Sequence, residues 1–233
     1  MYNAAGRSAV RLTWLTVRKK TASVFNRTVR DRFEVIEPHI RDRRVLDVGC
    51  VDARPARQQS SSRIGHKPDM LFRRIVAVNP QTVGVDVDEE GVKALAAMGY
   101  SVICADAQTM DLGRRFDTIV AGEIIEHLEN PGLFLRNAAR HLDGGGTLIV
   151  STPNPFYQGQ TWKIWRYGRP EVHEDHTNWQ DPTTLTALLR RCGFEIADGC
   201  WVQPRKSLFK TWKRLLRPYF SYAFVVVARW KGA

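Results

Sequence analysis

The sequence predicts an α/β fold in which a doubly wound parallel sheet carries helices on both faces. From residue 44 onward, short apolar runs alternate with amphipathic segments, a pattern typical of β-α-β units. Several of these runs end in Asp or Gly, as strands do where a parallel sheet meets a ligand. Of the 233 residues, 43% are hydrophobic, which is enough to build a complete core.

Each predicted strand is a short run rich in Val, Ile and Leu. The first five lie at residues 44–48, 82–87, 101–105, 116–121 and 146–151. Residues 88–98 and 131–142 are predicted helices, because each begins near an acid or a proline and is followed by glycine. A helix at 182–192 and strands at 194–197 and 221–230 complete the pattern.

Residues 1–43 differ from the rest and predict a basic helical N-terminal extension, with apolar residues at helical spacing between positions 8 and 40. The main domain is then expected at 44–233. Two of its stretches are longer than a minimal fold needs. We expect an insertion at 54–81 and a functional connection at 153–181, which is rich in proline, aromatic residues and histidine.

The net charge of +11 is concentrated at the two ends of the chain. Residues 1–44 carry +7 and residues 201–233 carry +8, whereas the middle carries −4. Basic ends predict contact with phosphate, an anionic membrane surface or nucleic acid. Four scattered cysteines without a C-x-x-C pair, and no apolar run of the ~20 residues that a membrane span needs, favour a cytoplasmic protein, with peripheral attachment to the inner membrane face as an option.

Acidic residues follow three consecutive predicted strands. Asp47 and Gly49 end the first, Asp86 ends the second, and Asp106 with Ala107 ends the third. Carboxyl ends of parallel strands share one edge, and an acid at such an edge can accept hydrogen bonds from a ribose diol. A NAD-type dehydrogenase is disfavoured, because the first turn lacks G-x-G-x-x-G.

Over residues 44–154 the chain resembles the class I S-adenosylmethionine-dependent methyltransferases. The shared segments are V-L-D-V-G-C, V-G-V-D, A-D-A, F-D-T-I-V-A-G-E-I-I-E-H-L-E-N-P and L-D-G-G-G-T-L-I-V-S-T-P-N. The resemblance implies a Rossmann-like methyltransferase fold of seven mostly parallel strands with the last antiparallel. It also implies that Asp47 and Gly49 lie beside the methionyl part of S-adenosylmethionine, Asp86 at the ribose, and Asp106 with Ala107 at the adenine.

The glycine turn departs from the pattern of that family, which usually reads G-C-G-x-G. Here Val51 and Ala53 stand where the second and third glycines would be, and Val is β-branched. The spacing from Gly49 to Asp86 is also long. A non-catalytic module that binds a cofactor or a partner is therefore one alternative.

The segment after the fourth strand suggests a metal site. If the chain turns helical there, Glu123, Glu126 and His127 fall at i, i+3 and i+4 on one side of the first turn. His173 and His176 lie in the later connection, which this fold places over the same edge of the sheet. Carboxylates with imidazoles suit a divalent cation, although Glu at a helix N-terminus also has a purely structural role.

The E-x-x-E-H motif with later histidines resembles metal-dependent O-methyltransferases. Small-RNA 3′-terminal 2′-O-methyltransferases carry both parts, and ubiquinone-pathway O-methyltransferases carry the first. The resemblance implies that Glu123, Glu126, His127 and His176 hold a divalent cation, Mg²⁺ or a similar ion, with His173 as ligand or base. A cation would lower the pKa of a bound hydroxyl, and an imidazole of His127, His173 or His176 could accept its proton.

The acceptor is predicted to be a hydroxyl compound, with a carbohydrate as the first choice. The S-T-P-N-P-F segment at 151–156, H-T-x-W-x-D-P at 176–182 and the C-G-F end at 192–194 resemble methyltransferases of glycan and polysaccharide biosynthesis. The basic ends fit a lipid-linked glycan, and they fit RNA equally well in charge. The 3′ end of RNA and a quinone-type small molecule are the alternatives, and the oligomeric state is left open.

Overall fold

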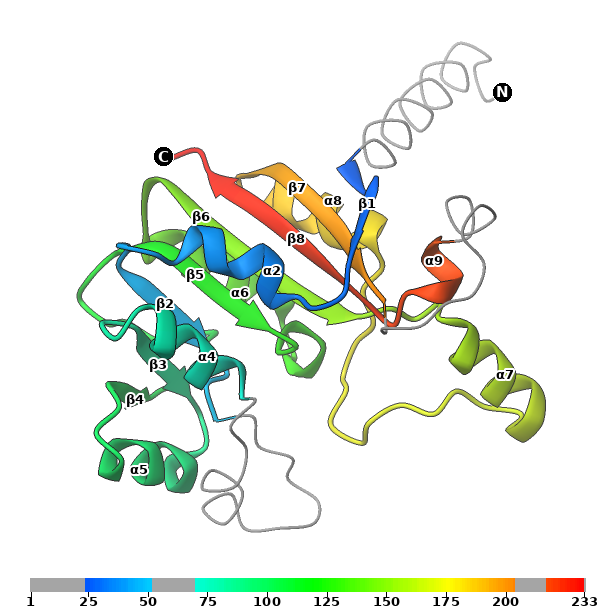
Figure 1. The fold of residues 1–233 in the computed structure, drawn as a ribbon, viewed down its shortest axis with the longest axis horizontal. Helices are drawn as coiled ribbons and strands as arrows, with labels where there is room; N and C mark the ends of the chain where they lie inside the picture. Colours follow the sequence, from blue (N-terminus) through cyan, green and yellow to red (C-terminus); the bar gives the residue numbers. More distant parts are fainter. Residues whose placement is uncertain (1–23, 52–69, 204–216, 233) are drawn as a thin grey trace, which may run out of the picture.

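The computed structural model describes residues 24–51, 70–203 and 217–232. Its centre is one eight-stranded sheet in the order β1-β7-β8-β6-β5-β2-β3-β4 (Figure 1). The last strand in the chain, β8, is antiparallel to both β6 and β7, and the other neighbouring strands pair in parallel. The strands are β1 Arg27–Val29, β2 Val45–Val48, β3 Val83–Asp86, β4 Val102–Cys104, β5 Phe116–Gly122, β6 Leu142–Pro153, β7 Phe194–Val202 and β8 Ala223–Trp230.

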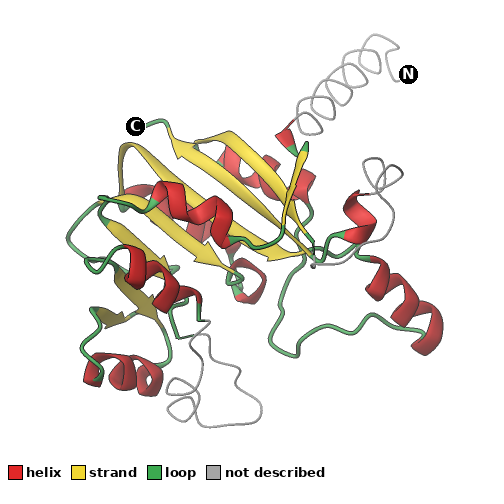
Figure 2. Ribbon diagram, viewed as in Figure 1, coloured by secondary structure: helices red, strands yellow, loops and turns green. Residues whose placement is uncertain are grey.

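Helices cover both faces of this sheet, so the molecule has three layers (Figure 2). The α-helices are α2 Phe33–Ile36, α4 Leu71–Val78, α5 Glu89–Ala97, α6 Pro131–Arg140, α7 Gln158–Tyr167, α8 Pro182–Arg191 and α9 Arg217–Phe220. Two 3₁₀ turns accompany them, η1 Glu37–His39 and η2 Ile125–His127. Three helices begin at side-chain caps that satisfy backbone N–H groups, from Asp88, Asn130 and Asp181.

The core is divided by the sheet into two large apolar clusters. Leu46 of β2 points to the side of α6 and α8, where it meets Phe134 and Leu185. The preceding residue, Val45, points to the opposite side, where α2 and α4 contribute Ile36 and Ile75. This alternation is the period of a strand buried on both faces, and it explains why the strands read as continuous apolar runs.

The predicted fold class is confirmed, and the predicted strand count is corrected from seven to eight. The additional strand is β1, which pairs in parallel with β7 through Arg27–Cys200 and Val29–Val202. It lies inside the stretch that was predicted to be helical. Phe25 anchors it, because this ring is buried against the rings of Trp201 and Phe224, with centroids 5.6 and 6.0 Å away.

The structure describes only part of the long stretches that the sequence singled out. Of the expected insertion, residues 70–81 are described and contain α4, whereas 54–69 lie outside the described residues, as do 1–23 of the N-terminal extension. The basic stretch at 204–216 also lies outside them. The connection at 153–181 contains α7, which projects away from the sheet (Figures 1 and 2).

Candidate functional site

The carboxyl ends of β2, β3 and β4 lie side by side and form one half of the site. Asp47 pairs in register with Gly84, and Asp86 pairs with Cys104. The structure therefore brings Asp47, Asp86 and the Asp106 turn to one edge, as the strand order predicted. Asp47 is 2% exposed, and burial raises the pKa of its carboxyl well above its usual range.

Gly49 makes the turn that follows β2. Its φ is +81°, a left-handed conformation that favours glycine, and its N–H donates to the Val85 carbonyl at 2.8 Å. A Cβ at this position would lie 2.9 Å from Cδ1 of Ile124. The turn therefore packs directly on the segment that leads into η2, so the two halves of the site are in contact.

The carboxylate of Asp86 organises the next turn. One oxygen accepts the Val51 N–H at 2.9 Å, and the other accepts the Asp88 N–H at 3.0 Å. Burial raises the pKa of Asp86, and these hydrogen bonds oppose the rise because they stabilise the charged form. The carboxylate has about four lone-pair sites and accepts from the backbone N–H groups of Val51, Asp88 and Val87, so it can still accept a hydrogen bond from a diol.

Val51, the residue that departs from the glycine pattern, is accommodated within the protein. Its side chain is 3% exposed and packs with Val92 and Leu95 of α5. It occupies the space beside Gly91, where a Cβ would overlap its Cγ1. The Val51 side chain is therefore turned toward α5, and its backbone N–H remains directed to Asp86.

Asp106 and Ala107 form the turn after β4. Asp106 is exposed and accepts the Gln108 N–H at 2.8 Å, whereas Ala107 is buried. Asn137 of α6 holds this turn by donating to the Ala107 carbonyl at 3.1 Å. The turn is thus fixed from behind, with the Asp106 side chain free to face a ligand.

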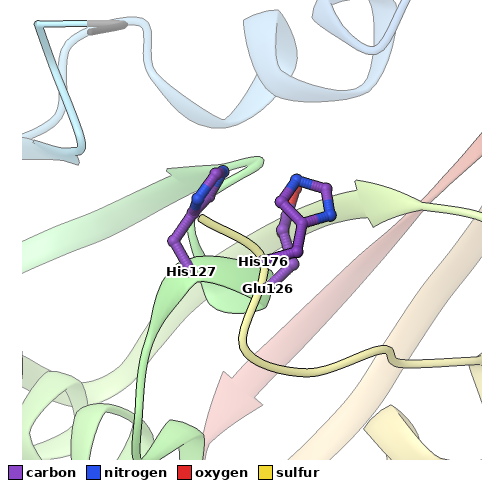
Figure 3. A group of neighbouring side chains, drawn as sticks. All are labelled: Glu126, His127 and His176. Atoms are coloured by element: carbon purple, nitrogen blue, oxygen red, sulfur yellow. The ribbon is translucent and has the colours of Figure 1, made fainter. Parts of the chain in front are cut away.

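Glu126, His127 and His176 form the second half of the site (Figure 3). One ligand atom from each lies within 4.8 Å of the others. The two histidine rings meet edge to face with centroids 4.6 Å apart. Glu126 and His127 come from η2, and His176 comes from the later connection. A cation here would therefore link two segments that lie about 50 residues apart in the sequence.

Glu126 is the buried member of this group, with 1% of its surface exposed. Burial raises the pKa of its carboxyl to about 7, against the opposing effect of hydrogen bonds that include one from Thr152 Oγ1 at 2.9 Å. A buried carboxylate with a single side-chain donor carries a desolvation cost that a cation would offset.

The two histidines of the group are suited to bind as neutral ligands. Burial is the main cause that lowers the pKa of both His127 and His176. His127 hydrogen-bonds through its ring to the Asp175 backbone, which fixes one nitrogen and leaves the other for a ligand. Nδ1 of His176 is buried without a hydrogen-bond partner. These donors fit a divalent cation of the Mg²⁺, Mn²⁺ or Zn²⁺ type.

His173 stands next to the group without belonging to it. Its ring centroid is 6.1 Å from that of His127 and 5.8 Å from that of His176. Its Nδ1 lies 3.1 Å from Oδ2 of Asp175. The Asp175 backbone N–H also donates to this Nδ1, at 3.4 Å, so Asp175 fixes the position of the His173 ring.

Glu123 takes a different position from the one that helical spacing predicts. It has φ of +55°, so the chain does not turn helical at this residue, and the 3₁₀ turn begins only at Ile125. The Glu123 carboxylate lies 2.6 Å from Arg32 Nη1 and is outside the group of three ligands. A ligand role for Glu123 therefore remains a prediction, and its present partner is a cation of the protein itself.

The connection that bears His173 and His176 is fastened to η2 by backbone acceptors. The Thr177 N–H donates to the Glu126 carbonyl at 2.9 Å. The Asn178 amide donates to the carbonyls of Ile125 at 3.1 Å and Leu128 at 3.0 Å. These bonds hold His176 against Glu126 and His127.

Several residues that shape the site were not found from the sequence. Thr152 contacts Glu126, and Asp175 contacts His173. Asn178 fastens the connection, and Arg32 reaches Glu123 from the N-terminal part of the chain. The H-E-D-H-T-N run at 173–178 contained a signal for Asp175 and Asn178, since polar residues interleaved with two candidate ligands are natural supports. No local pattern marked Arg32.

Comparison with known proteins identifies the family of this chain. A methyltransferase domain matches residues 19–198 of the chain. The chain belongs to the class I S-adenosylmethionine-dependent methyltransferases. The match covers more than half of the protein and includes both halves of the site.

Curated relatives are similar to this methyltransferase at low sequence identity. A ubiquinone biosynthesis O-methyltransferase of Azorhizobium caulinodans is 32% identical over 114 residues, which are 48% of this chain and 40% of that protein. Its counterpart in Rhizobium etli is 25% identical over 177 residues, 72% of this chain and 66% of that protein. The chain thus spans about half the length of the curated relatives it matches.

Solved structures agree with the methyltransferase fold. A SAM-dependent methyltransferase from Archaeoglobus fulgidus superposes with a TM-score of 0.57 at 16% identity, covering 85% of this chain and 91% of that one. At this identity the likeness shows the fold alone. Among the described residues, no helix of this methyltransferase is long and apolar enough to cross a membrane.

Proposed function

We propose that this protein is an S-adenosylmethionine-dependent O-methyltransferase that uses a divalent cation and methylates a sugar hydroxyl. The observation that carries the proposal is the convergence of Glu126, His127 and His176 within 4.8 Å of one another, beside the turn at Gly49. A methyl donor and a cation site on one sheet edge would bring the donor and an acceptor hydroxyl together.

The cofactor half has the chemistry that S-adenosylmethionine requires. The carboxylate of Asp86 offers lone pairs to the ribose diol, and the Asp106 turn offers the buried Ala107 as an apolar neighbour for the adenine. Gly49 leaves the turn without a side chain, which would allow a ligand to approach the backbone closely, and a Cβ there would also meet Ile124.

Glu126, His127 and His176 would hold the cation. A divalent ion bound there would lower the pKa of an acceptor hydroxyl and fix its position. Thr152 orients the Glu126 carboxylate, and the Asp175 backbone orients the His127 ring. The protein thus supplies supports for two of the three donors before any ion binds.

We assign to His173 the role of the base that accepts the hydroxyl proton. In methyl transfer the S–CH₃ bond of the sulfonium breaks, the O–CH₃ bond forms, and the hydroxyl proton must leave. His173 would take it on its free ring nitrogen, and Asp175, whose Oδ2 lies 3.1 Å from Nδ1, would hold the ring in position. The products are the methyl ether, S-adenosylhomocysteine and protonated His173.

The acceptor side is formed by a helix with exposed aromatic residues. In α7, Trp162 is 57% exposed, Trp165 80% and Tyr167 61%, and none of the ten residues of the helix is buried. Aromatic faces of this kind stack on the apolar faces of sugar rings. Because α7 leads from β6 into the connection that bears His173, an acceptor held on it would lie on the same side as the site.

A quinone-type phenol is the second candidate acceptor. Two curated relatives are named for ubiquinone biosynthesis, at 32% and 25% identity. A flat aromatic acceptor would stack on the same tryptophans.

The cation is tested with Glu126→Gln, which keeps the shape of the side chain and removes its charge. We expect methyl transfer to fall by about 100-fold or more, both in this variant and after EDTA, because the hydroxyl loses its activation. Binding of S-adenosylhomocysteine, measured by calorimetry, should change less than about twofold. Glu129→Gln, an exposed acid of the same segment, is the matched control and should keep full activity.

Full methyl transfer in EDTA would refute the role of the cation. The acceptor is tested separately with a panel of glycan, quinone-precursor and RNA 3′-end acceptors. Labelling of RNA or of a phenol, with the glycans unlabelled, would refute the sugar assignment and leave the cation intact.

A further inference from the structure

A cavity of about 570 Å³ lies outside the site described above, between the 108–115 segment and the outer side of α6. Arginines enter it from both walls. Arg114 and Arg115 come from the segment that leads into β5, and Arg136 and Arg140 come from α6. The last two are one helical turn apart at i and i+4, so they share one face of α6. We call this feature the arginine cavity.

Hydrogen bonds fix the two walls of the arginine cavity to each other. Asn137 donates from α6 to the Met110 carbonyl at 3.0 Å, in addition to its bond to Ala107. At the far end, Nε2 of His141 accepts the Leu112 N–H at 3.1 Å, and its Nδ1 faces the Asn137 carbonyl at 2.9 Å. The backbone segments of the two walls are therefore held in place by the protein itself.

The charge in the arginine cavity is not neutralised by the protein. Asp111 is the one acid that lines it, and its carboxylate accepts the Gly113 N–H. Within the part of the chain that the structure describes, Arg114, Arg136 and Arg140 form no ion pair. By contrast, Arg44, which lies near the same end of β5, holds both Asp117 and Asp143.

The surroundings make this concentration of cations unusual for the chain. Residues 45–200, which include the whole cavity, carry a net charge of −4. Four arginines facing one acid in an acidic region indicate an anionic ligand with more than one charge. Guanidinium groups bind phosphoryl oxygens in a bidentate manner, and a cavity of this volume is in the range of small-molecule sites.

We propose that the arginine cavity binds a small ligand that carries at least two phosphoryl groups, of the diphosphate type. Arg136 and Arg140 would hold one phosphoryl group from α6, and Arg114 and Arg115 would hold the other from the facing segment. The proposal is independent of the methyltransferase assignment, because none of the four arginines belongs to the cofactor or cation residues.

The test is calorimetric titration of the full chain with inorganic pyrophosphate. Orthophosphate and sulfate serve as probes that carry a single phosphoryl or sulfuryl group. We expect pyrophosphate to bind about tenfold or more tightly than either probe. Arg136→Gln combined with Arg140→Gln should weaken pyrophosphate binding by about tenfold or more, and Arg114→Gln should weaken it independently. The matched control is Arg190→Gln with Arg191→Gln, two exposed arginines of α8, which should bind as the wild type does.

Thermal unfolding and binding of S-adenosylhomocysteine report whether each variant is folded. Equal binding of pyrophosphate and orthophosphate, or an equal loss in the α8 control, would overturn the proposal, since either result means unspecific attraction. RNA binding that is lost in the Arg136/Arg140 variant and is not displaced by pyrophosphate would also overturn it, and would assign the cavity to a nucleic-acid backbone.

Discussion

Val51 shows how one residue can leave a family pattern without closing the cofactor site. A β-branched residue replaces glycine in the turn, and its side chain fits beside Gly91 of α5 because that position has no Cβ. Gly91 is costly in a helix, by about 1 kcal/mol relative to alanine. Its presence is explained by the volume that Val51 needs.

Gly91→Ala should therefore destabilise the protein, although alanine favours the helix. We expect a loss of about 1–3 kcal/mol in the free energy of unfolding, because the new Cβ overlaps Val51. Val51→Ala in the same chain should recover part of the loss. Chemical denaturation of the two single variants and the double variant measures the coupling. Strictly additive effects would contradict the pairing.

The buried carboxyl of Glu126 makes the free energy of unfolding depend on pH. Its pKa is about 7 in the folded protein against 4.5 ordinarily, so between these values the folded state binds more protons than the unfolded state. In EDTA, the contribution of Glu126 to the free energy of unfolding is complete below about pH 4.5 and is lost as the pH rises through about 7.

Glu126→Gln removes this dependence, because an amide does not ionise. Relative to the wild type, the variant should be more stable at pH 8 by up to roughly 3 kcal/mol and equal to it near pH 4.5. Denaturation in EDTA across this range measures the difference. The raised pKa values of Asp47 and Asp86 are common to both proteins and cancel. A constant difference at all pH values would contradict the assignment.

At the scale of elements, the site depends on how one connection is fastened to one turn. The 173–178 run is held on η2 by donors to the carbonyls of Ile125, Glu126 and Leu128. The Leu128 N–H closes the 3₁₀ turn on the Ile125 carbonyl at 3.4 Å, and the connection supplies donors to the Glu126 and Leu128 carbonyls. The same bonds that complete the turn also place His176.

Asn178→Ala should weaken the cation site more than the fold. It removes the amide's bonds to the Ile125 and Leu128 carbonyls and the acceptor of the Gln180 amide, each worth about 1 kcal/mol, and it loosens the segment that places His176 beside Glu126. We expect the affinity for Mn²⁺, measured by calorimetry, to fall by about tenfold or more. Glu174→Gln changes an exposed residue of the same run and should bind Mn²⁺ as before. Unchanged affinity in Asn178→Ala would contradict the role of this contact.

The elements with a strong local pattern were predictable from the sequence. The five strands from β2 to β6 and the helices α5 and α6 were found because apolar runs and caps specify them locally. Strand β1 was not, since Arg27–Val29 lies between apolar residues at helical spacing and is fixed by Phe25 on Trp201, a contact across more than 170 residues. Glu123 was misplaced for a similar reason, because its left-handed conformation and its pairing with Arg32 depend on distant parts of the chain.

At the scale of the whole molecule, the last strand of the chain lies inside the sheet. β8 pairs with β6 on one side and β7 on the other, and Ala223–Ala228 are all buried. Its residues contribute to both large apolar clusters, with Val226 in one and Val225 in the other. In the part of the chain that the structure describes, the β1-β7 pair therefore joins the rest of the sheet by pairing with β8.

Removal of residues after Phe220 should abolish folding of the whole domain. Without β8, the β1-β7 pair has no place on the sheet, and both apolar clusters lose part of their cover. We expect no cooperative unfolding transition by circular dichroism and no binding of S-adenosylhomocysteine. Removal of residues 232–233 alone is the control. A cooperative transition in the shorter chain would show that β2 to β6 fold independently.

The two outermost strands of the sheet are also its shortest. β1 and β4 have three residues each, whereas β5 to β8 have seven to twelve. A free strand edge is a template on which other chains can add, and the risk grows with the length of the edge. By keeping its long strands inside and three-residue strands at the borders, this protein limits edge-to-edge aggregation at high concentration.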